Sequence, residues 1–269
     1  MSTMVQGLRV PAPSITVRET ESLARHAYSL IGAEYYDAAH ITCRNFDETV
    51  DTYLQRCPPV LSSGSRYLEV GCGRSRLARY SGPKVQIVVM DISEAMLAHS
   101  EFGVGSASAL LGSAFKLPFR RGTFANVFAF LADPYMHAQY ATELRRTVAP
   151  GGRIVQIVPA YEWGAPLRES RQSPAHFSHF FRGTHEAFGP SFLLPKEGLF
   201  ELFANAGFDE IRLTDLFLPS AVPAHCISPD IKKPADLRNC SPYELPLLTV
   251  IEGKVLATES PTRNIGFRI

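Results

Sequence analysis

Two glycines and an acid stand in the chain at a spacing that suits the binding of a nucleoside. Gly71 and Gly73 follow an apolar run in the stretch YLEVGCGRSRLAR, and Asp91 ends the next apolar run, 20 residues after Gly71. Glycine allows a tight turn and a close approach of the backbone to a ligand. The N–H groups of a following helix would point into the same space. A carboxylate at the end of the next strand can accept hydrogen bonds from both hydroxyls of a ribose.

The same glycines leave two alternatives open, a plain turn without a ligand and a site for a nicotinamide dinucleotide. The dinucleotide fingerprint has a third glycine, and this chain has Arg76 in its place. Glu69 precedes the first glycine by two residues. It is a poor neighbour for a pyrophosphate, although it suits a cationic amino group. These features count against the dinucleotide.

A second group of reactive side chains follows the fourth strand-like run, in the stretch LADPYMH. Asp133, Tyr135 and His137 are of types that orient a nucleophile or take its proton, and we expect Tyr135 and His137 to be catalytic. In the alternative interpretation, Asp133 and Pro134 cap the strand while Tyr135 packs in the core.

Three histidines lie close together in the stretch HFSHFFRGTH, at positions 176, 179 and 185. No carboxylate or thiolate recurs near them at the spacing of metal ligands. We therefore expect no metal, and we interpret these histidines as structural or as part of a pocket wall.

The elements that must position these residues alternate along the chain. The strand-like runs are RYLEV, VQIVVMD, ALLG, TFANVFAFL and RIVQIV. Helical or turn segments separate them, among them SEAMLAHSEF, with Ser93 as its N-cap. Near-continuous apolar strands alternating with helices predict a parallel sheet covered on both faces. The stretches 160–195 and 219–244 show neither pattern, and we expect them to be long and irregular.

The composition of the 269-residue chain argues against several classes of protein. The net charge of +1 provides no basic surplus to hold a nucleic-acid backbone. The apolar runs are too short for a membrane span, and the first residues lack the pattern of a signal peptide. Five cysteines without a C-x-x-C pair favour reduced thiols and a cytoplasmic location.

Four stretches together resemble the successive motifs of class I S-adenosylmethionine-dependent methyltransferases: YLEVGCGRSRLA, VVMDISEAML, LGSAFKLPFRRGTFANVFAF and VAPGGRIVQIVPA. The resemblance covers Arg66 to Ala160, and FANAGFDEIRL extends it. It implies an α/β fold with a Rossmann-like, seven-stranded, mostly parallel sheet, an antiparallel last strand and helices on both faces. It also implies S-adenosylmethionine as the cofactor.

The resemblance further implies which residues bind the cofactor. The turn from Glu69 to Gly73 would hold the methionine moiety, Asp91 the ribose, and Ile92 and Met96 the adenine. Ser113 stands where the family often has an acid for the adenine amino group, and it can still accept one hydrogen bond. Arg74 or Arg76 would help with the cofactor carboxylate or remain on the surface. The expected cofactor-binding set is Tyr36, Glu69, Gly71, Gly73, Asp91, Ile92, Met96, Ser113, Ala114, Phe115 and Leu131.

We expect a flexible leader over residues 1–18 and a single methyltransferase domain over residues 19–269. Its parts would be a helical lid (19–60), a cofactor-binding core (66–160), a substrate-side insert (161–195) and a C-terminal helix with strands (196–269). In the lid, Tyr35, Tyr36 and His40 would lie over the cofactor.

The insert is rich in aromatic residues, namely Tyr161, Trp163, Phe177, Phe180, Phe181, Phe188 and Phe192. Such density predicts a small, largely apolar or aromatic acceptor, methylated mainly by proximity with help from a general base. The alternatives are a nucleic-acid or protein methylase, which predicts a basic rim, and a non-enzymatic protein that keeps the fold for binding. LADPYMH is similar to the Asp-Pro-Pro-Tyr motif of nucleic-acid methylases but lacks the second proline, so we do not expect nucleic acid as a partner.

Overall fold

The computed structural model describes residues 15–257 apart from 83, 101–105, 174–175 and 183–184. Residues 1–14 of the expected leader lie outside the described residues, and its last two residues already belong to helix α1 (Val17–Ile31). Thr16 begins this helix with a capping box, in which its side chain accepts from the Glu19 N–H and Glu19 accepts from the Thr16 N–H.

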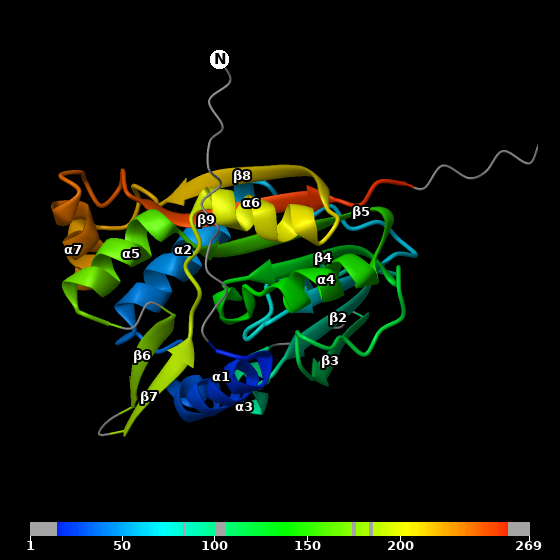
Figure 1. Cartoon of the computed structure of the whole chain (residues 1–269), viewed down its shortest axis with the longest axis horizontal. Coiled ribbons are helices and arrows are strands. Elements are labelled where there is room, and N and C mark those ends of the chain that lie inside the picture. Colours follow the sequence, from blue (N-terminus) through cyan, green and yellow to red (C-terminus); the bar gives the residue numbers. More distant parts are fainter. Residues whose placement is uncertain (1–14, 83, 101–105, 174–175, 183–184, 258–269) are drawn as a thin grey trace, which may run out of the picture.

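A seven-stranded sheet forms the centre of the molecule, in the order β3-β2-β1-β4-β5-β9-β8 (Figure 1). Strands β1 to β5 pair in parallel, whereas β9 runs antiparallel to β5 and β8. This arrangement confirms the predicted Rossmann-like sheet with its antiparallel last strand. The strands are β1 (Arg66–Val70), β2 (Gln86–Asp91), β3 (Ser106–Leu111), β4 (Phe124–Phe130), β5 (Val148–Pro159), β8 (Asp209–Phe217) and β9 (Pro246–Lys254).

Helices cover both faces of the sheet, because successive side chains of a strand point to opposite faces. Val127 and Ile154 pack in one buried cluster with residues of α1, α4 (Ala138–Thr147) and α6 (Lys196–Asn205). Phe128 and Ile157 pack in a second cluster with α2 (Ile41–Arg56) and α7 (Pro229–Leu237). Burial on both faces explains why the strands are near-continuous apolar runs.

The strand order reverses between β1 and β4, the two strands that start the halves of the sheet. In open α/β sheets, ligands bind outside the carboxyl ends of the strands at such a reversal. At this edge lie α2, α5 (Tyr161–Ser170) and a separate hairpin of β6 (Phe177–Arg182) and β7 (His185–Pro190) (Figure 1). The short helix α3 (Glu94–Leu97), with Ser93 as the predicted N-cap, follows β2.

Three local expectations were wrong. Residues 160–195 are not irregular but form α5 and the β6–β7 hairpin, and residues 219–244 contain η4 (Ala224–Cys226) and α7. Prolines inside both helices, Pro166 and Pro234, obscure their period. After β1 there is no α-helix but only the 3-10 helix η2 (Leu77–Tyr80).

Candidate functional site

The turn after β1, residues 71–73, is a concave stretch of backbone that depends on its two glycines, and it is called the cradle below. Gly71 has φ of +62° and Gly73 has φ of +44°, a region that other residues adopt at a cost. A Cβ at position 71 would lie 3.0 Å from the Ala132 Cβ, and one at position 73 would lie 3.1 Å from the Met96 Cε and against the Tyr36 hydroxyl. Because neither residue has a Cβ, the backbone of the turn itself forms this wall of the adjoining cavity.

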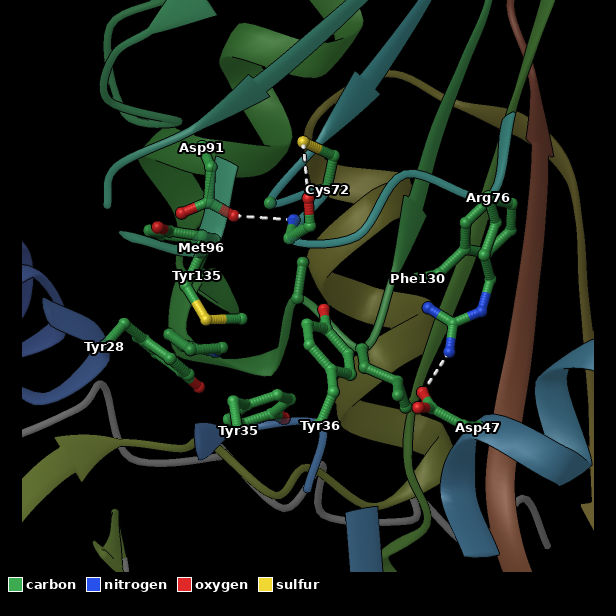
Figure 2. A pocket seen from close by; sticks show the side chains of 15 residues that line it. Tyr28, Tyr35, Tyr36, Asp47, Cys72, Arg76, Asp91, Met96, Phe130 and Tyr135 are labelled. Carbon is green, nitrogen blue, oxygen red and sulfur yellow. Dashed lines mark hydrogen bonds and ion pairs between the residues drawn. The ribbon is translucent and has the colours of Figure 1, made fainter. Parts of the chain in front are cut away.

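Asp91 fixes the turn from the neighbouring strand. Its Oδ2 accepts a hydrogen bond from the Gly73 N–H at 2.9 Å (Figure 2). Its Oδ1 accepts one from the Ser93 N–H at 2.9 Å. Burial raises the pKa of Asp91, and these backbone hydrogen bonds oppose the rise. Each oxygen keeps a further lone pair for a ligand, and the side chain lines the adjoining cavity.

Glu69 serves the turn and not the cavity, which differs from the expected contact with a methionine amino group. It is 0% exposed, and its carboxylate accepts hydrogen bonds from the Ser75 hydroxyl and from the N–H groups of Arg76 and Leu77, at 2.5, 3.1 and 3.0 Å. These N–H groups begin η2, so Glu69 satisfies them in the way that an N-cap does.

Three tyrosines from the N-terminal segment close the cavity beside the cradle (Figure 2). The Tyr36 hydroxyl accepts a hydrogen bond from the Arg74 N–H at 2.8 Å, and the Arg74 guanidinium lies 4.4 Å from the centre of the Tyr36 ring. Tyr35 packs edge-on against Tyr36, with ring centres 5.0 Å apart, and Tyr28 lies on the other side of Tyr35. Tyr28 was not singled out from the sequence, because it carries no motif and reaches the site only through the fold of α1.

The cavity at the cradle has a volume of about 40 Å³, which is room for water and not for a nucleoside. It is lined by six residues of the expected cofactor set, namely Tyr36, Gly71, Gly73, Asp91, Met96 and Leu131. A glycine cradle with a carboxylate beside it fits a nucleoside cofactor once Tyr36 moves away.

The residues expected at the adenine do not line this cavity. Arg25 of α1 donates to the Ile92 carbonyl at 3.3 Å, and the Ser113 hydroxyl is hydrogen bonded to Glu21 of the same helix. Ser113 also accepts from the Phe115 N–H at 3.1 Å, while Ala114 and Phe115 are buried. Helix α1 therefore covers this region, and a role for these residues at the adenine remains a prediction that requires α1 side chains to shift.

Comparison with known proteins identifies the domain. Residues 68–156 match the family model described as "Methyltransferase domain". No curated protein matches the sequence significantly. This part of the chain is therefore a methyltransferase domain, and the match is consistent with the class I S-adenosylmethionine-dependent methyltransferase family.

Solved structures share the fold of this methyltransferase. A chain in the complex of the Haloferax volcanii Trm112 methyltransferase activator with a methyltransferase has a TM-score of 0.65 at 16% identity, over 88% of this chain and 99% of that one. A Thermotoga maritima S-adenosylmethionine-dependent methyltransferase has a TM-score of 0.56 at 19% identity, over 86% and 99%. The Haemonchus contortus phosphoethanolamine N-methyltransferase 2, solved with S-adenosylhomocysteine, has a TM-score of 0.56 at 14% identity, over 85% and 59%.

The arginines of the methyltransferase turn are held by α2. Arg76 is 4% exposed, and its guanidinium pairs with Asp47 and, at 3.3 Å, with Asp51. Arg74 pairs with Asp47 at 3.2 Å. Because both arginines pair with Asp47, neither is only a solvated surface residue. Arg76 also lines the cofactor cavity together with Asp47 (Figure 2).

A second and larger cavity, of about 420 Å³, adjoins the first. Tyr28, Tyr35 and Leu131 line both cavities and form the boundary between them. Leu131 directly follows β4 and has φ of +63°, an uncommon conformation for leucine that marks a strained point of the backbone. The walls of the second cavity include the aromatic residues Phe46, Trp163, Phe177 and Phe180.

Polar groups also reach the second cavity. The short helix η3 (Asp133–Tyr135) presents Asp133, which is 8% exposed, and α5 presents Arg168. Arg168 Nη2 donates to the Ser191 Oγ at 2.8 Å. Burial raises the pKa of Asp133 to about 6, and a hydrogen bond from Ser191 and the charge of Arg168 oppose the rise. The sequence offered no signal for Arg168 and Ser191, which only the fold of the insert brings to Asp133.

The two residues expected to be catalytic lie elsewhere. Tyr135 is 4% exposed and packs beside Gly71 in the first cavity, and burial raises the pKa of its phenol well above the usual value, so it is a poor base. The His137 Nδ1 accepts from the Gln139 N–H at 3.3 Å and caps α4, and its ring packs against Phe115. His137 lines neither cavity. The structure therefore does not support the expected catalytic pair, because η3 turns Asp133 and not these side chains to the second cavity.

Two of the three histidines of the insert, His176 and His179, have side chains in the described part of the chain. Among the described residues there is no group of three or more histidine, cysteine or acidic side chains that could hold a metal ion. His179 lies 3.0 Å from a Glu186 oxygen and stacks on Phe188. The side chains of Phe181 and His185 lie outside the described part of the chain.

Within the described ranges no helix is long and apolar enough to cross a membrane.

Proposed function

We propose that this enzyme methylates a small, largely apolar or aromatic molecule held in the second cavity. The observation that carries the proposal is the shared boundary of the two cavities at Tyr28, Tyr35 and Leu131. A molecule in the aromatic cavity would lie next to the cofactor cradle, with the insert enclosing it.

The cofactor supplies an electrophilic methyl group bound to a positively charged sulfur. We propose that Gly71, Gly73 and Asp91 hold it on the side of the first cavity. The enzyme then contributes mainly by holding the acceptor in line with the methyl group and excluding water. Trp163 is held in place for this role by the hydrogen bond from its Nε1 to the Asp230 carbonyl at 2.9 Å and by its edge-on contact with Phe46.

We also propose a cytoplasmic location, supported by five cysteines that are all free thiols in the structure. In the Haloferax volcanii structure, the second protein is an activator of the methyltransferase. We do not propose a protein as the acceptor of this chain. The second cavity is sized for a small molecule. Its charged residues, among those that the structure describes, are two acids and two arginines, with no cationic excess.

The experiment is a transfer of isotopically labelled methyl groups from S-adenosylmethionine into cell extract, separated into small-molecule and macromolecular fractions. We expect the label in small, apolar compounds. The control is the Asp91→Ala variant, which we expect to bind S-adenosylhomocysteine about 2 kcal/mol more weakly because the ribose loses a charged acceptor. Label only in protein or nucleic acid would contradict the proposal.

A further inference from the structure

Asp133 lines the second cavity and stands close in the sequence to Leu131, a residue of the boundary with the cofactor cavity. It follows Leu131 by two residues, and Leu131 lines both cavities. Its charge is also felt by Tyr28, another boundary residue, whose pKa it raises along with burial. A carboxylate at this place lines the cavity close to its boundary with the cofactor side.

Ser191 and Arg168 hold this carboxylate in a defined way. The Ser191 oxygen accepts a hydrogen bond from Arg168 at 2.8 Å, so the single hydrogen of Ser191 is left for Asp133. Ser191 is 5% exposed, and the neighbouring Phe192 N–H donates to the Asp133 carbonyl at 3.3 Å, which anchors this segment to η3. The protein thus supplies two donors to the Asp133 carboxylate, the Ser191 hydroxyl and the N–H of Asp133 itself, and the remaining lone pairs are left for the cavity.

The charges around the second cavity are matched in pairs. Among its described lining residues, the carboxylates are Asp133 and Asp230. Arg168 acts on Asp133, and Arg171 forms an ion pair with Asp230. The negative charge of both acids is therefore already offset by an arginine, which leaves little attraction for a cationic substrate. An uncharged O–H group needs only an oxygen that accepts its hydrogen bond.

We infer that the acceptor is an uncharged hydroxyl compound, an apolar alcohol or a phenol, whose O–H group donates to Asp133, with Ser191 and Arg168 as positioning residues. This inference rests on the proposed function. The acceptor oxygen forms the new bond to the methyl carbon while the bond from that carbon to sulfur breaks, leaving its electron pair on sulfur. The hydroxyl proton passes to the Asp133 carboxylate and then to water. The products are a methyl ether and S-adenosylhomocysteine.

The protonation of Asp133 suits a base that works near neutral pH. With a pKa of about 6 it is ionised at pH 7 and is a stronger base than an exposed aspartate. The charged and titratable groups around it are Arg168 on α5, Tyr28 on α1 and Cys43 on α2. Burial raises the pKa of Cys43 to about 12 and that of Tyr28 well above its usual value, so neither changes charge near pH 6.

The test uses the only tryptophan of the chain, Trp163, which lines the cavity and reports binding through its fluorescence. The probes are 4-nitrobenzyl alcohol, its methyl ether and 4-nitrobenzylamine, each of which quenches tryptophan through its nitro group. We expect the alcohol to bind the full chain about tenfold more tightly than the ether or the amine. Asp133→Ala should abolish this preference and leave the affinity for S-adenosylhomocysteine unchanged.

The positioning role has its own readout in the pH dependence of methyl transfer to the alcohol. Because Ser191 lowers the pKa of Asp133, Ser191→Ala should move the midpoint of the pH profile upward, and Ser191→Thr, which keeps the hydroxyl, should restore it. Equal binding of alcohol and ether, tighter binding of the amine, or an unmoved midpoint would overturn this inference alone. Absence of quenching by all three probes, or methyl transfer to macromolecules only, would overturn the proposed function with it.

Discussion

At the scale of single residues, the contact between Gly73 and Tyr36 decides whether the cradle is open. Gly73 has positive φ, and a Cβ on it would meet the Tyr36 hydroxyl, which already accepts from the Arg74 N–H. The left-handed conformation alone costs a non-glycine residue about 1 kcal/mol. The added methyl group would also take up space at one end of the cofactor cavity, whether or not Tyr36 has moved.

Gly73→Ala should therefore weaken the binding of S-adenosylhomocysteine about tenfold or more, as measured by calorimetry. Gly64→Ala is the matched control, because Gly64 has φ of +80° but nothing within 4 Å of a Cβ. It should lose stability and keep its cofactor affinity. Equal affinity in the two variants would show that the space left free at Gly73 has no part in binding.

Asp133 links function to stability. Its pKa of about 6 in the folded protein lies above that of an unfolded aspartate. Between about pH 4 and pH 6 the folded state thus binds more protons than the unfolded state, and stability falls as the pH rises through this window. Asp133→Asn should raise the free energy of unfolding by about 3 kcal/mol at pH 7 and by less at pH 5.

Urea unfolding at the two pH values measures this effect. Asp209→Asn, an exposed position at the start of β8, is the control and should change stability little at either pH. A destabilised Asp133→Asn at pH 7 would mean that the hydrogen bond with Ser191 outweighs the cost of burying the charge.

At the scale of elements, α2 is docked onto the cofactor turn by ion pairs. Arg76 is buried between Asp47 and Asp51, and Asp47 also holds Arg74. Removal of one partner of a buried pair leaves a charge that is poorly compensated. We expect Asp47→Asn to cost about 2 kcal/mol of stability, since Asp51 remains.

Thermal unfolding of Asp47→Asn and Glu48→Gln checks this expectation. Glu48 is the next residue on α2 and is exposed, so its substitution should be nearly neutral. If the two variants melt together, the pairs of Arg76 do not hold α2 to the turn.

The elements also show how far the sequence could predict the site. Strands β1, β2, β4 and β5 were readable because burial on both faces makes most of their residues apolar. Gly71, Gly73 and Asp91 were readable because their spacing follows from that strand order. The role of Glu69 was misread, since its carboxylate turns inward to η2. Arg168 and Ser191 were missed, because only the fold of α5 and of the segment after β7 brings them to Asp133. Pro166 inside α5 obscures the helical period of that element.

At the scale of the whole molecule, three segments that are distant in sequence meet over the carboxyl ends of the strands. Tyr28 and Tyr35 come from the N-terminal part, Leu131 and Asp133 follow β4, and the insert brings Trp163. The insert lies at the carboxyl ends of the strands (Figure 1) and lines the second cavity, which shares its boundary with the cavity of the glycine turn. In the proposed function, the common core would thus supply the cofactor cradle and the added parts would supply the acceptor cavity.

The hydrogen bond between Tyr36 and the Arg74 N–H has a consequence for the speed of cofactor association. A protein whose cavity measures about 40 Å³ must open before a nucleoside can bind. In stopped-flow mixing with S-adenosylhomocysteine, the observed rate constant should thus level off at high ligand concentration, at the rate of opening. Tyr36→Ala removes the side chain that fills the cradle and should raise that plateau, whereas Tyr161→Ala, an exposed position on α5 outside both cavities, should leave it unchanged. A rate that rises linearly with concentration in the unaltered chain would mean that the ligand itself displaces Tyr36.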